Sequence, residues 1–336
     1  MKRYGNLYEQ ITDFANLYDA SQKAISGHRD KPSVIRFWFN LENELFILQN
    51  ELKTHTYQPR PYQIFFVREP KLRQICAAPI RDRVVHHAVC SIVGPIWEKT
   101  MISDSFACRV GKGTLAAILR AKHFSGKFNF FLQCDIKHYF AMIDRTILQK
   151  IIRRKIKDQS TLQLLDVIIE QDLHGSEIGK GVPIGNLTSQ YFANLYLNQL
   201  DHFVKETLRV KGFVRYMDDF LLYADDIDEL HDFHLSILSF AANELNLQLK
   251  ENRIIAPCSQ GISFLGFRTF PHLLRLQGRK WRRFRQKIET LEKDFFAGEI
   301  KEDELANRAQ SMIAHISKAD SLQARRKFFA KSRQTW

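Results

Sequence analysis

The sequence predicts an α+β fold, in which an antiparallel sheet packs against helices. Runs rich in aromatic and branched residues lead into Asp135 and flank Asp218 and Asp219, as expected for strands bounded by tight turns. Elsewhere apolar residues recur at helical spacing, most clearly over 146–172 and 227–245. A chain of 336 residues with 45% hydrophobic residues can bury a substantial core, divided into roughly two or three subdomains.

The composition is strongly basic. Lys and Arg number 50 against 37 Asp and Glu, so the formal net charge is +13. The excess is concentrated at the C-terminal end, where residues 268–336 contain 17 basic and 8 acidic residues. A polyanion such as a nucleic acid is therefore the first partner to expect.

Neither the cysteines nor the N-terminus indicate secretion. The five cysteines are widely spaced, without the short intervals of a zinc site, so we expect reduced thiols in the core. The stretch MKRYGNLYEQITDFANLYDA is amphipathic and lacks the apolar run of a signal peptide. No segment approaches the roughly 18 apolar residues that span a bilayer. We expect a cytoplasmic protein without a membrane partner.

In the N-terminal part, leucines at helical spacing predict a helix over 36–53. The next segment, YQIFFVREPKLRQICAAP (62–79), predicts two strands joined by a Pro-Lys turn. A helix follows, with Arg81 and Arg83 in its first turn. A basic first turn opposes the helix dipole unless an anion lies nearby.

Two later segments combine turn or basic residues with a helical period. Glycines and a proline in GKGVPIGNLTSQ (179–190) predict a turn that opens a helix. The C-terminal GRKWRRFRQK (278–287) interleaves arginines with Trp281 and Phe284. This pattern suits contact with a nucleic-acid backbone while the aromatic rings pack behind the arginines.

The segment VRYMDDFLLYADD contains two acidic pairs with different flanks. Strand-like residues surround Asp218-Asp219, which predicts a hairpin with this pair at its tip. Asp225-Asp226 instead precedes a helical period, so one of the two is expected to be an N-cap. A polar turn is the structural alternative for the first pair. Asp135, a third carboxylate at the end of an apolar strand, favours a cation site, with oxygen ligands that suit Mg²⁺ or Mn²⁺.

Several of these blocks occur together in one order. FFLQCDIKHYF, GVPIGNLTSQYFANLYL, YMDDFLLYA and ISFLGF resemble the palm motifs of reverse transcriptases, and PKLRQICAAPIRDRVVHHAV resembles their fingers. The resemblance implies a right-hand polymerase, with fingers, a palm whose antiparallel sheet packs on helices, and a helical thumb. It divides the chain into a helical extension at 1–59, fingers at 60–127, a palm with a helical insertion at 128–270 and a basic thumb at 271–336.

The resemblance implies an RNA-directed DNA polymerase, with template RNA, cDNA and dNTPs as partners. It also implies two Mg²⁺ ions, or Mn²⁺ in their place, at the reacting phosphate. Asp135 and Asp218 would be the principal metal ligands and Asp219 the accompanying carboxylate, with the backbone of Ile136 at the metal site.

The block GVPIGNLTSQ departs from most reverse transcriptases, which have Gln in place of Ile184 and Ser-Pro where this chain has Ser189-Gln190. It resembles the enzymes of diversity-generating retroelements, within the group II intron-like bacterial family, which copy a template RNA with frequent errors at adenines. This resemblance implies a bacterial or phage-encoded enzyme and a small, basic, oligomeric accessory protein. The alternative is that Ile184 is a packing residue in an accurate enzyme.

The resemblance also assigns binding residues. The nucleotide is expected to contact Lys71, Arg73, Phe140, Ile184, Gly185 and Gln190. The template and primer are expected to contact Arg81, Arg83, Arg109, Phe264, Leu265, Gly266, Arg282, Arg283 and Arg285. For the arginines, a surface salt bridge or a solvated face is the structural alternative. Either Lys250 or Arg253 is expected to protonate the pyrophosphate.

Two other functions stay open. A retron-like or other bacterial defence reverse transcriptase would share the chemistry, although the Ser-Gln ending argues against it. A catalytically idle RNA-binding scaffold would not need the three carboxylates. Because the chain ends soon after the expected thumb, we expect no endonuclease, RNase H or DNA-binding appendage.

Overall fold

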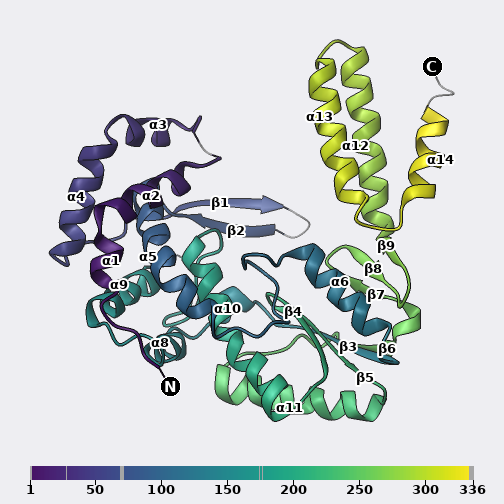
Figure 1. Cartoon of the computed structure of the whole chain (residues 1–336), viewed down its shortest axis with the longest axis horizontal. Coiled ribbons are helices and arrows are strands. Elements are labelled where there is room, and N and C mark those ends of the chain that lie inside the picture. Colours follow the sequence, from purple (N-terminus) through teal and green to yellow (C-terminus); the bar gives the residue numbers. More distant parts are fainter. Residues whose placement is uncertain (1, 28, 69–71, 174, 176, 333–336) are drawn as a thin grey trace.

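The computed structural model describes residues 2–27, 29–68, 72–173, 175 and 177–332. Figure 1 shows three regions in a row: N-terminal helices with a strand hairpin, a central sheet with its helices, and a projecting group of C-terminal helices. Over these residues no helix has both the length and the apolar character of a membrane span. The mixture of antiparallel sheet and helix is the α+β architecture that the sequence predicts.

The N-terminal region is helical. Its helices are α1 (Tyr8–Thr12), α2 (Phe14–Ile25), α3 (Pro32–Phe39), α4 (Leu41–Lys53) and α5 (Ile80–Glu98). The single helix expected over 36–53 is replaced by α3 and α4, because the backbone leaves the helical region at Asn40 (φ −116°, ψ 25°). The break allows Phe37 of α3 and Leu45 of α4 both to enter the main core.

A hairpin of β1 (Gln63–Arg68) and β2 (Leu72–Ala77) extends from this region and confirms the two predicted strands. Its expected turn, which contains Lys71, lies outside the described residues. β1 is exposed along its length. The end of β2 is attached to a distant segment, since the Cys76 N–H donates to the Ile184 carbonyl oxygen at 2.9 Å.

The central sheet has the strand order β4-β5-β3-β6, with antiparallel neighbours. Its strands are β3 (Phe130–Asp135), β4 (Gly212–Tyr216), β5 (Asp219–Ala224) and β6 (Ile254–Pro257), and the covering helices are α6 (Thr114–Ser125), α10 (Leu187–His202), which continues as η1 (Phe203–Thr207), and α11 (Ile227–Leu245). Leu222 faces the larger core with α10 and α11, whereas Leu221 faces a second core with α6. Helices therefore cover both faces of the sheet.

Two helices replace the single one expected over 146–172. They are α8 (Arg145–Arg153) and α9 (Gln159–Glu170), preceded by α7 (Tyr139–Met142). The break occurs at Asp158, whose carboxylate accepts a hydrogen bond from the Thr161 N–H at 3.0 Å and so caps α9. A local side-chain contact thus ends one helical period and begins another.

The C-terminal region begins with a small sheet of order β7-β8-β9 and continues into helices that project from the molecule (Figure 1). Its elements are η2 (Cys258–Gln260), β7 (Ile262–Phe264), β8 (Phe267–Thr269), β9 (Leu274–Leu276), α12 (Gly278–Phe296), α13 (Glu302–Ile316) and α14 (Leu322–Ser332). This sheet runs across the boundary expected at residue 270. Trp281 stacks on Phe284 with ring centroids 5.4 Å apart, which is the aromatic packing predicted behind the arginines.

The two acidic pairs occupy different kinds of site. Asp218 lies in the turn of the β4–β5 hairpin and Asp219 begins β5, as predicted. Asp226 is the N-cap of α11, where its carboxylate accepts from a backbone N–H of the first turn at 3.0 Å. Asp225 instead accepts from the Asn129 N–H at 3.0 Å and fastens the start of β3. The capping prediction is therefore confirmed for Asp226 alone.

Replacing Asp226 with Ala should destabilise the fold by about 1 kcal/mol, because α11 loses the side chain that caps its first turn. Urea unfolding at neutral pH measures the change. Asp232→Ala is the matched control, since Asp232 is exposed on the same helix, and it should have little effect. Equal free energies of unfolding for all three proteins would contradict the capping role.

Candidate active site

Three carboxylates gather where β3 and β5 pair. Asp135 ends β3 and lies directly opposite Asp219, the first residue of β5, in the antiparallel register. Asp218 precedes Asp219 in the hairpin turn and follows Met217, whose φ of 57° lies in the left-handed region. The hairpin pair therefore lies beside the end of the neighbouring strand, as the sequence predicts.

Polar partners offset part of this charge. Gln133 Nε2 donates to Asp219 Oδ1 at 3.1 Å, and the Lys250 ammonium forms an ion pair with Asp135 Oδ2. The Lys250 N–H also donates to the Asp135 carbonyl oxygen at 2.8 Å. Asp135 Oδ1 is buried, and no donor in the described part of the chain reaches it. One carboxylate oxygen is thus left without a partner.

Burial and mutual repulsion raise the pKa of two of these carboxyl groups. Burial raises the pKa of Asp219 to about 7; the Gln133 hydrogen bond acts in the opposite direction, and the charges of Asp135 and Asp218 add to the rise. The pKa of Asp218 is raised first by burial and then by the charge of Asp135. The cluster therefore has a greater demand for a cation than separate surface carboxylates have.

The chemistry of this donor set fits a divalent cation. Among the described residues, no three His, Cys, Asp or Glu side chains are arranged to hold a metal ion by themselves. The raised pKa values and the unpaired Asp135 oxygen nevertheless show an unmet demand for positive charge. Carboxylate oxygens are the ligands that Mg²⁺ and Mn²⁺ prefer. Ile136 follows Asp135 directly; its side chain is buried, and its backbone forms an isolated bridge with Leu249.

The GVPIG segment packs closely against β2. Immediately after both segments, the Ala78 N–H donates to Asn186 Oδ1 at 3.2 Å. Gly185 has a φ of +117°, and a Cβ at this position would lie 2.9 Å from Ile75 Cγ2, so both the backbone and the approach of β2 require glycine. Arg73 is exposed and lies two residues before Ile75, hence on the same strand face. β2 therefore presents Arg73 on the face that meets Gly185.

Phe140 is joined to the same segment. Its carbonyl oxygen accepts from the Val182 N–H at 2.9 Å, and its side chain is half-buried against the main core. Gln190 is half-buried in the first turn of α10. The structure thus places Phe140, Ile184 and Arg73 around one backbone-bonded junction.

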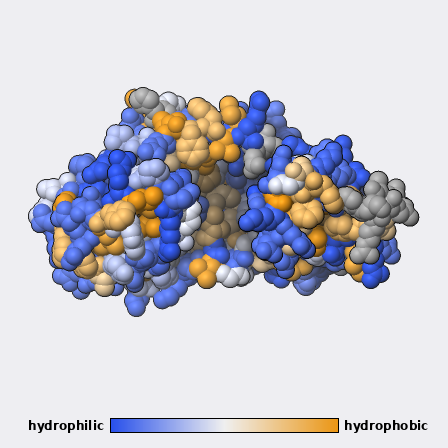
Figure 2. All heavy atoms as spheres, turned by 90° about the horizontal axis from the view of Figure 1, so that it is seen from above, coloured by the Kyte–Doolittle hydropathy of each residue, from blue (hydrophilic) through white to orange (hydrophobic). Residues whose placement is uncertain are grey.

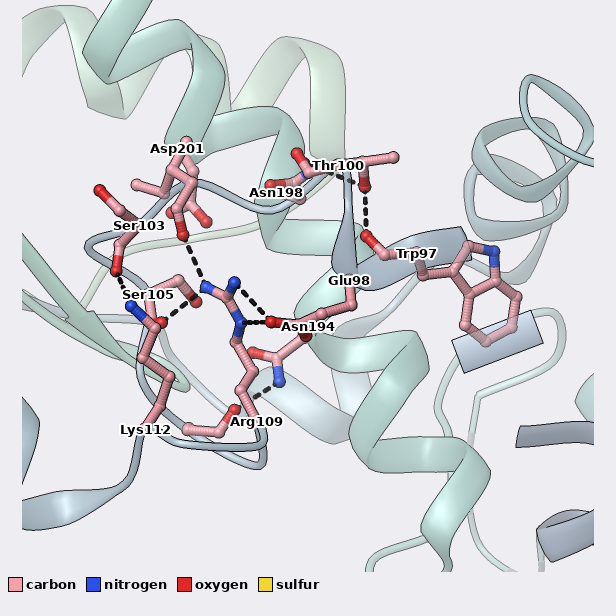
Figure 3. Close-up of polar contacts among 12 residues, drawn as sticks. Trp97, Glu98, Thr100, Ser103, Ser105, Arg109, Lys112, Asn194, Asn198 and Asp201 are labelled. Carbon is pink, nitrogen blue, oxygen red and sulfur yellow. Dashed lines mark hydrogen bonds and ion pairs between the residues drawn. The ribbon is translucent and has the colours of Figure 1, made fainter. Parts of the chain in front are cut away.

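Two of the arginines expected on the template are engaged within the protein. Arg81 is buried in an ion pair with Glu51. The Arg109 guanidinium pairs with Glu98 at 2.6 Å and donates to two backbone carbonyls of its own loop (Figure 3). We therefore assign both side chains to the fold, which is the salt-bridge alternative named for them.

Arg83 has a different environment. Burial lowers the pKa of its guanidinium, and the residue lines a cavity of about 280 Å³ beside α3 and β2. Lys31, Arg36 and Arg60 line the same cavity, with Glu44 as the acidic residue on its wall. This excess of positive charge suits a phosphate group.

The FLGF segment forms the turn between β7 and β8. Phe264 is fully buried, so its side chain belongs to the core and not to a nucleic-acid surface. Leu265 (φ 50°) and Gly266 (φ 84°) are both left-handed. The Lys280 side chain of α12 crosses Gly266 and donates to the Leu265 carbonyl oxygen at 3.3 Å. The part of FLGF that remains for a primer is the backbone of this turn.

The arginines of α12 are exposed as expected, whereas Lys280 is half-buried. Arg282 and Arg285 are three positions apart and share one face of the helix. Arg283 lines a groove of about 670 Å³ with residues of both α12 and α13. The exposed arginines therefore lie outside the buried aromatic cluster around Phe284.

The sequence analysis missed Gln133 and Arg215. Gln133 is two positions before Asp135, so strand alternation puts both on one face, and this signal was present in the sequence. Arg215 stands two positions before the hairpin turn in an otherwise apolar strand and is fully buried against Asp201. Its charge within an apolar run was a signal, but its distant partner was not.

These features define the right-hand polymerase fold. A hairpin with paired carboxylates lies in an antiparallel sheet between helices, and a strand hairpin and a helical arm flank that sheet. A family model described as "Reverse transcriptase (RNA-dependent DNA polymerase)" matches residues 67–269, and the chain belongs to this family.

This chain matches only part of the length of the relatives to which it is similar. Protein YkfC of Escherichia coli (strain K12) is 28% identical over 211 residues, which are 59% of this chain and 55% of the relative. The group II intron-encoded protein LtrA of Lactococcus lactis subsp. cremoris is 28% identical over 198 residues, 57% of this chain and 32% of LtrA. The structure of apo telomerase from Candida tropicalis has a TM-score of 0.50 at 12% identity, covering 69% of this chain and 52% of that one, and shows the fold alone.

The raised pKa of Asp219 predicts a pH-dependent stability of the metal-free protein. The pKa is about 7 when folded, against about 3.9 in an unfolded chain. Between these values the folded state binds a proton that the unfolded state has lost, so stability falls as pH rises through this window. Asp219→Asn should flatten that fall, as measured by the melting temperature in the presence of a chelator. If the melting temperature falls equally steeply with pH in both proteins, the pKa of Asp219 is not raised in the folded protein.

Proposed function

We propose that this protein is an RNA-directed DNA polymerase. A primer 3′-hydroxyl attacks the α-phosphate of a dNTP, a phosphodiester bond forms, and pyrophosphate leaves. The observation that carries the proposal is the register of β3 and β5, which sets Asp135 opposite Asp219 and beside Asp218 in a chain of the reverse transcriptase family.

The carboxylates would act as metal ligands. Asp135 and Asp218 would hold the two ions, with Asp219 and the backbone of Ile136 completing the donor set. Mg²⁺, or Mn²⁺ in its place, would favour ionisation of the 3′-hydroxyl and neutralise the leaving pyrophosphate.

Of the two candidates for protonating the pyrophosphate, we assign Lys250. Its ammonium lies at Asp135, whereas Arg253 is exposed in the segment that precedes β6. Lysine also releases a proton far more readily than arginine does.

The nucleotide would be bound beside the junction where β2 and the GVPIG segment meet. Arg73 would reach the triphosphate, together with Lys71. Phe140 would lie under the deoxyribose and exclude a 2′-hydroxyl by collision. Gly185 and Gln190 would complete the wall, with Gly185 admitting the close approach of β2.

Template and product would lie in the hollow that Figure 2 shows between the N-terminal region and the C-terminal helices. The basic cavity at Arg83 would receive a template phosphate, and the backbone of Leu265 and Gly266 would support the primer. Arg282 and Arg285 would hold the duplex through its phosphates, without regard to sequence.

At the finer level, we propose error-prone cDNA synthesis in a bacterial or phage diversity-generating retroelement. The support is the motif Ile184-Gly185 with Ser189-Gln190, because an isoleucine offers the nucleotide no hydrogen bond. A small, basic, oligomeric accessory protein is part of this proposal, and a cytoplasmic location follows from it.

Asp218→Asn should abolish nucleotide addition on an RNA template while folding and template binding stay nearly intact. Primer extension measures the first, and circular dichroism with filter binding the others. Asp225→Asn is the matched control: the amide oxygen can still accept from the Asn129 N–H, so activity should be retained. Equal losses in both variants would overturn the assignment of the hairpin pair.

Charge reversal at Arg282, Arg283 and Arg285 should weaken template–primer binding for every sequence and flatten its dependence on salt, because fewer counterions are released. The control reverses Lys23, Lys53 and Lys150, which are exposed on α2, α4 and α8 and make the same change in net charge. If both variants behave alike, the thumb arginines act only through overall charge.

Ile184→Gln should lower misincorporation opposite template adenine several-fold without abolishing synthesis. The added amide restores a hydrogen bond worth on the order of 1 kcal/mol, and about 1.4 kcal/mol is tenfold in selectivity. Sequencing cDNA made by both enzymes from one template measures the error rate. An active variant with an unchanged adenine error rate would make Ile184 a packing residue.

A further inference from the structure

Arg215 of β4 is fully buried, and its guanidinium uses its whole donor set. Nε and Nη2 donate to the two carboxylate oxygens of Asp201, each at 2.6 Å. Nη2 also donates to Ser105 Oγ at 3.0 Å. Nη1 donates to Asn194 Oδ1 at 3.2 Å and to the Met217 carbonyl oxygen at 3.0 Å. All five N–H groups of the side chain therefore have acceptors.

These acceptors come from separate parts of the fold. Asp201 and Asn194 lie on α10, and Ser105 lies in the loop after α5. The loop also pairs with β4, since the Arg215 N–H donates to the Asp104 carbonyl oxygen at 2.9 Å.

The loop is itself held in place. Arg109 donates to the carbonyl oxygens of Ile102 at 2.6 Å and Ser105 at 2.7 Å, and Lys112 Nζ donates to the carbonyl oxygen of Ser103 at 2.8 Å (Figure 3). Arg215 is therefore hydrogen-bonded both to α10 and to a loop that internal hydrogen bonds hold in place.

The contact with Met217 is the one that reaches the reacting end of the hairpin. Met217 is the left-handed residue of the turn, with a φ of 57°, and Asp218 follows it. A non-glycine residue in this region is held there by its surroundings at a cost in free energy. The Arg215 guanidinium supplies that restraint, because its hydrogen bond to the Met217 carbonyl oxygen orients the peptide group that leads into Asp218.

We propose that Arg215 is a positioning residue for the polymerase reaction, which sets the turn that carries Asp218 and Asp219. The inference rests on the proposed function. A buried ion pair is often no more stabilising than apolar residues of similar volume. Its presence under this turn is accounted for by the orientation that the fork of Arg215 imposes.

The first test replaces Arg215 with Lys, which keeps a cation for Asp201 and loses the fork that reaches Met217. Single-turnover addition of one dNTP should slow by about 100-fold, the scale on which small misplacements of reacting groups act. Template–primer Kd and dNTP KM should stay close to wild type. Ser105→Ala is the comparison variant: it removes one bond of the same guanidinium away from the turn and keeps the bond to Met217, so it should slow the reaction far less than Arg215→Lys.

A second variant separates positioning from stability. Arg215→Met with Asp201→Leu replaces the pair by apolar residues and should fold with a melting temperature near that of wild type, yet it should be as slow as Arg215→Lys. If this folded double variant adds dNTP at the wild-type rate, Arg215 is structural and the inference is overturned. Wild-type protein that fails to extend a primer on RNA would instead overturn the proposed function, whatever the variants do.

Discussion

The structure depends on holding three carboxylates together in a partly buried place. Asp135 and Asp219 are paired by the sheet register, and burial, followed by the charge of Asp135, raises the pKa of both Asp218 and Asp219. Gln133 and Lys250 offset part of the charge from the sheet side. The Arg215 guanidinium, which α10 and the loop after α5 hold in place, restrains the turn through its hydrogen bond to the Met217 carbonyl oxygen.

The helices that cover both faces of the sheet help to keep the three carboxylates together. Because Leu222 and Leu221 face two different cores, β5 is packed on both faces, which favours the register that sets Asp219 opposite Asp135. The β2 strand is attached to the segment around Ile184 by a backbone hydrogen bond from the Cys76 N–H. The β1–β2 hairpin and the hairpin that carries Asp218 and Asp219 are therefore both hydrogen-bonded to α10 or to the segment that leads into it, although they are far apart in the sequence.

Much of this could be predicted from the sequence, because local pattern decides it. The β4–β5 hairpin, the strand ending at Asp135 and the long helix after Asp226 follow from strand and helix periods and from a cap. The helix breaks at Asn40 and Asp158 could not be predicted, since apolar spacing continues across both. The roles of the arginines were equally hidden. The sequence does not distinguish an exposed arginine from a buried one until its partner is known, as Glu51 is for Arg81. The burial of Phe264 likewise depends on the tertiary fold.

The crossing of Lys280 over Gly266 gives the C-terminal arm a mechanical property. The long aliphatic stem lies against a residue without a side chain, its ammonium donates to the Leu265 carbonyl oxygen, and it lies 5.4 Å from the centre of the Phe267 ring. The Lys280 side chain thus lies directly between the base of α12 and the FLGF turn. A displacement of α12 would therefore reach that turn through the Lys280 side chain.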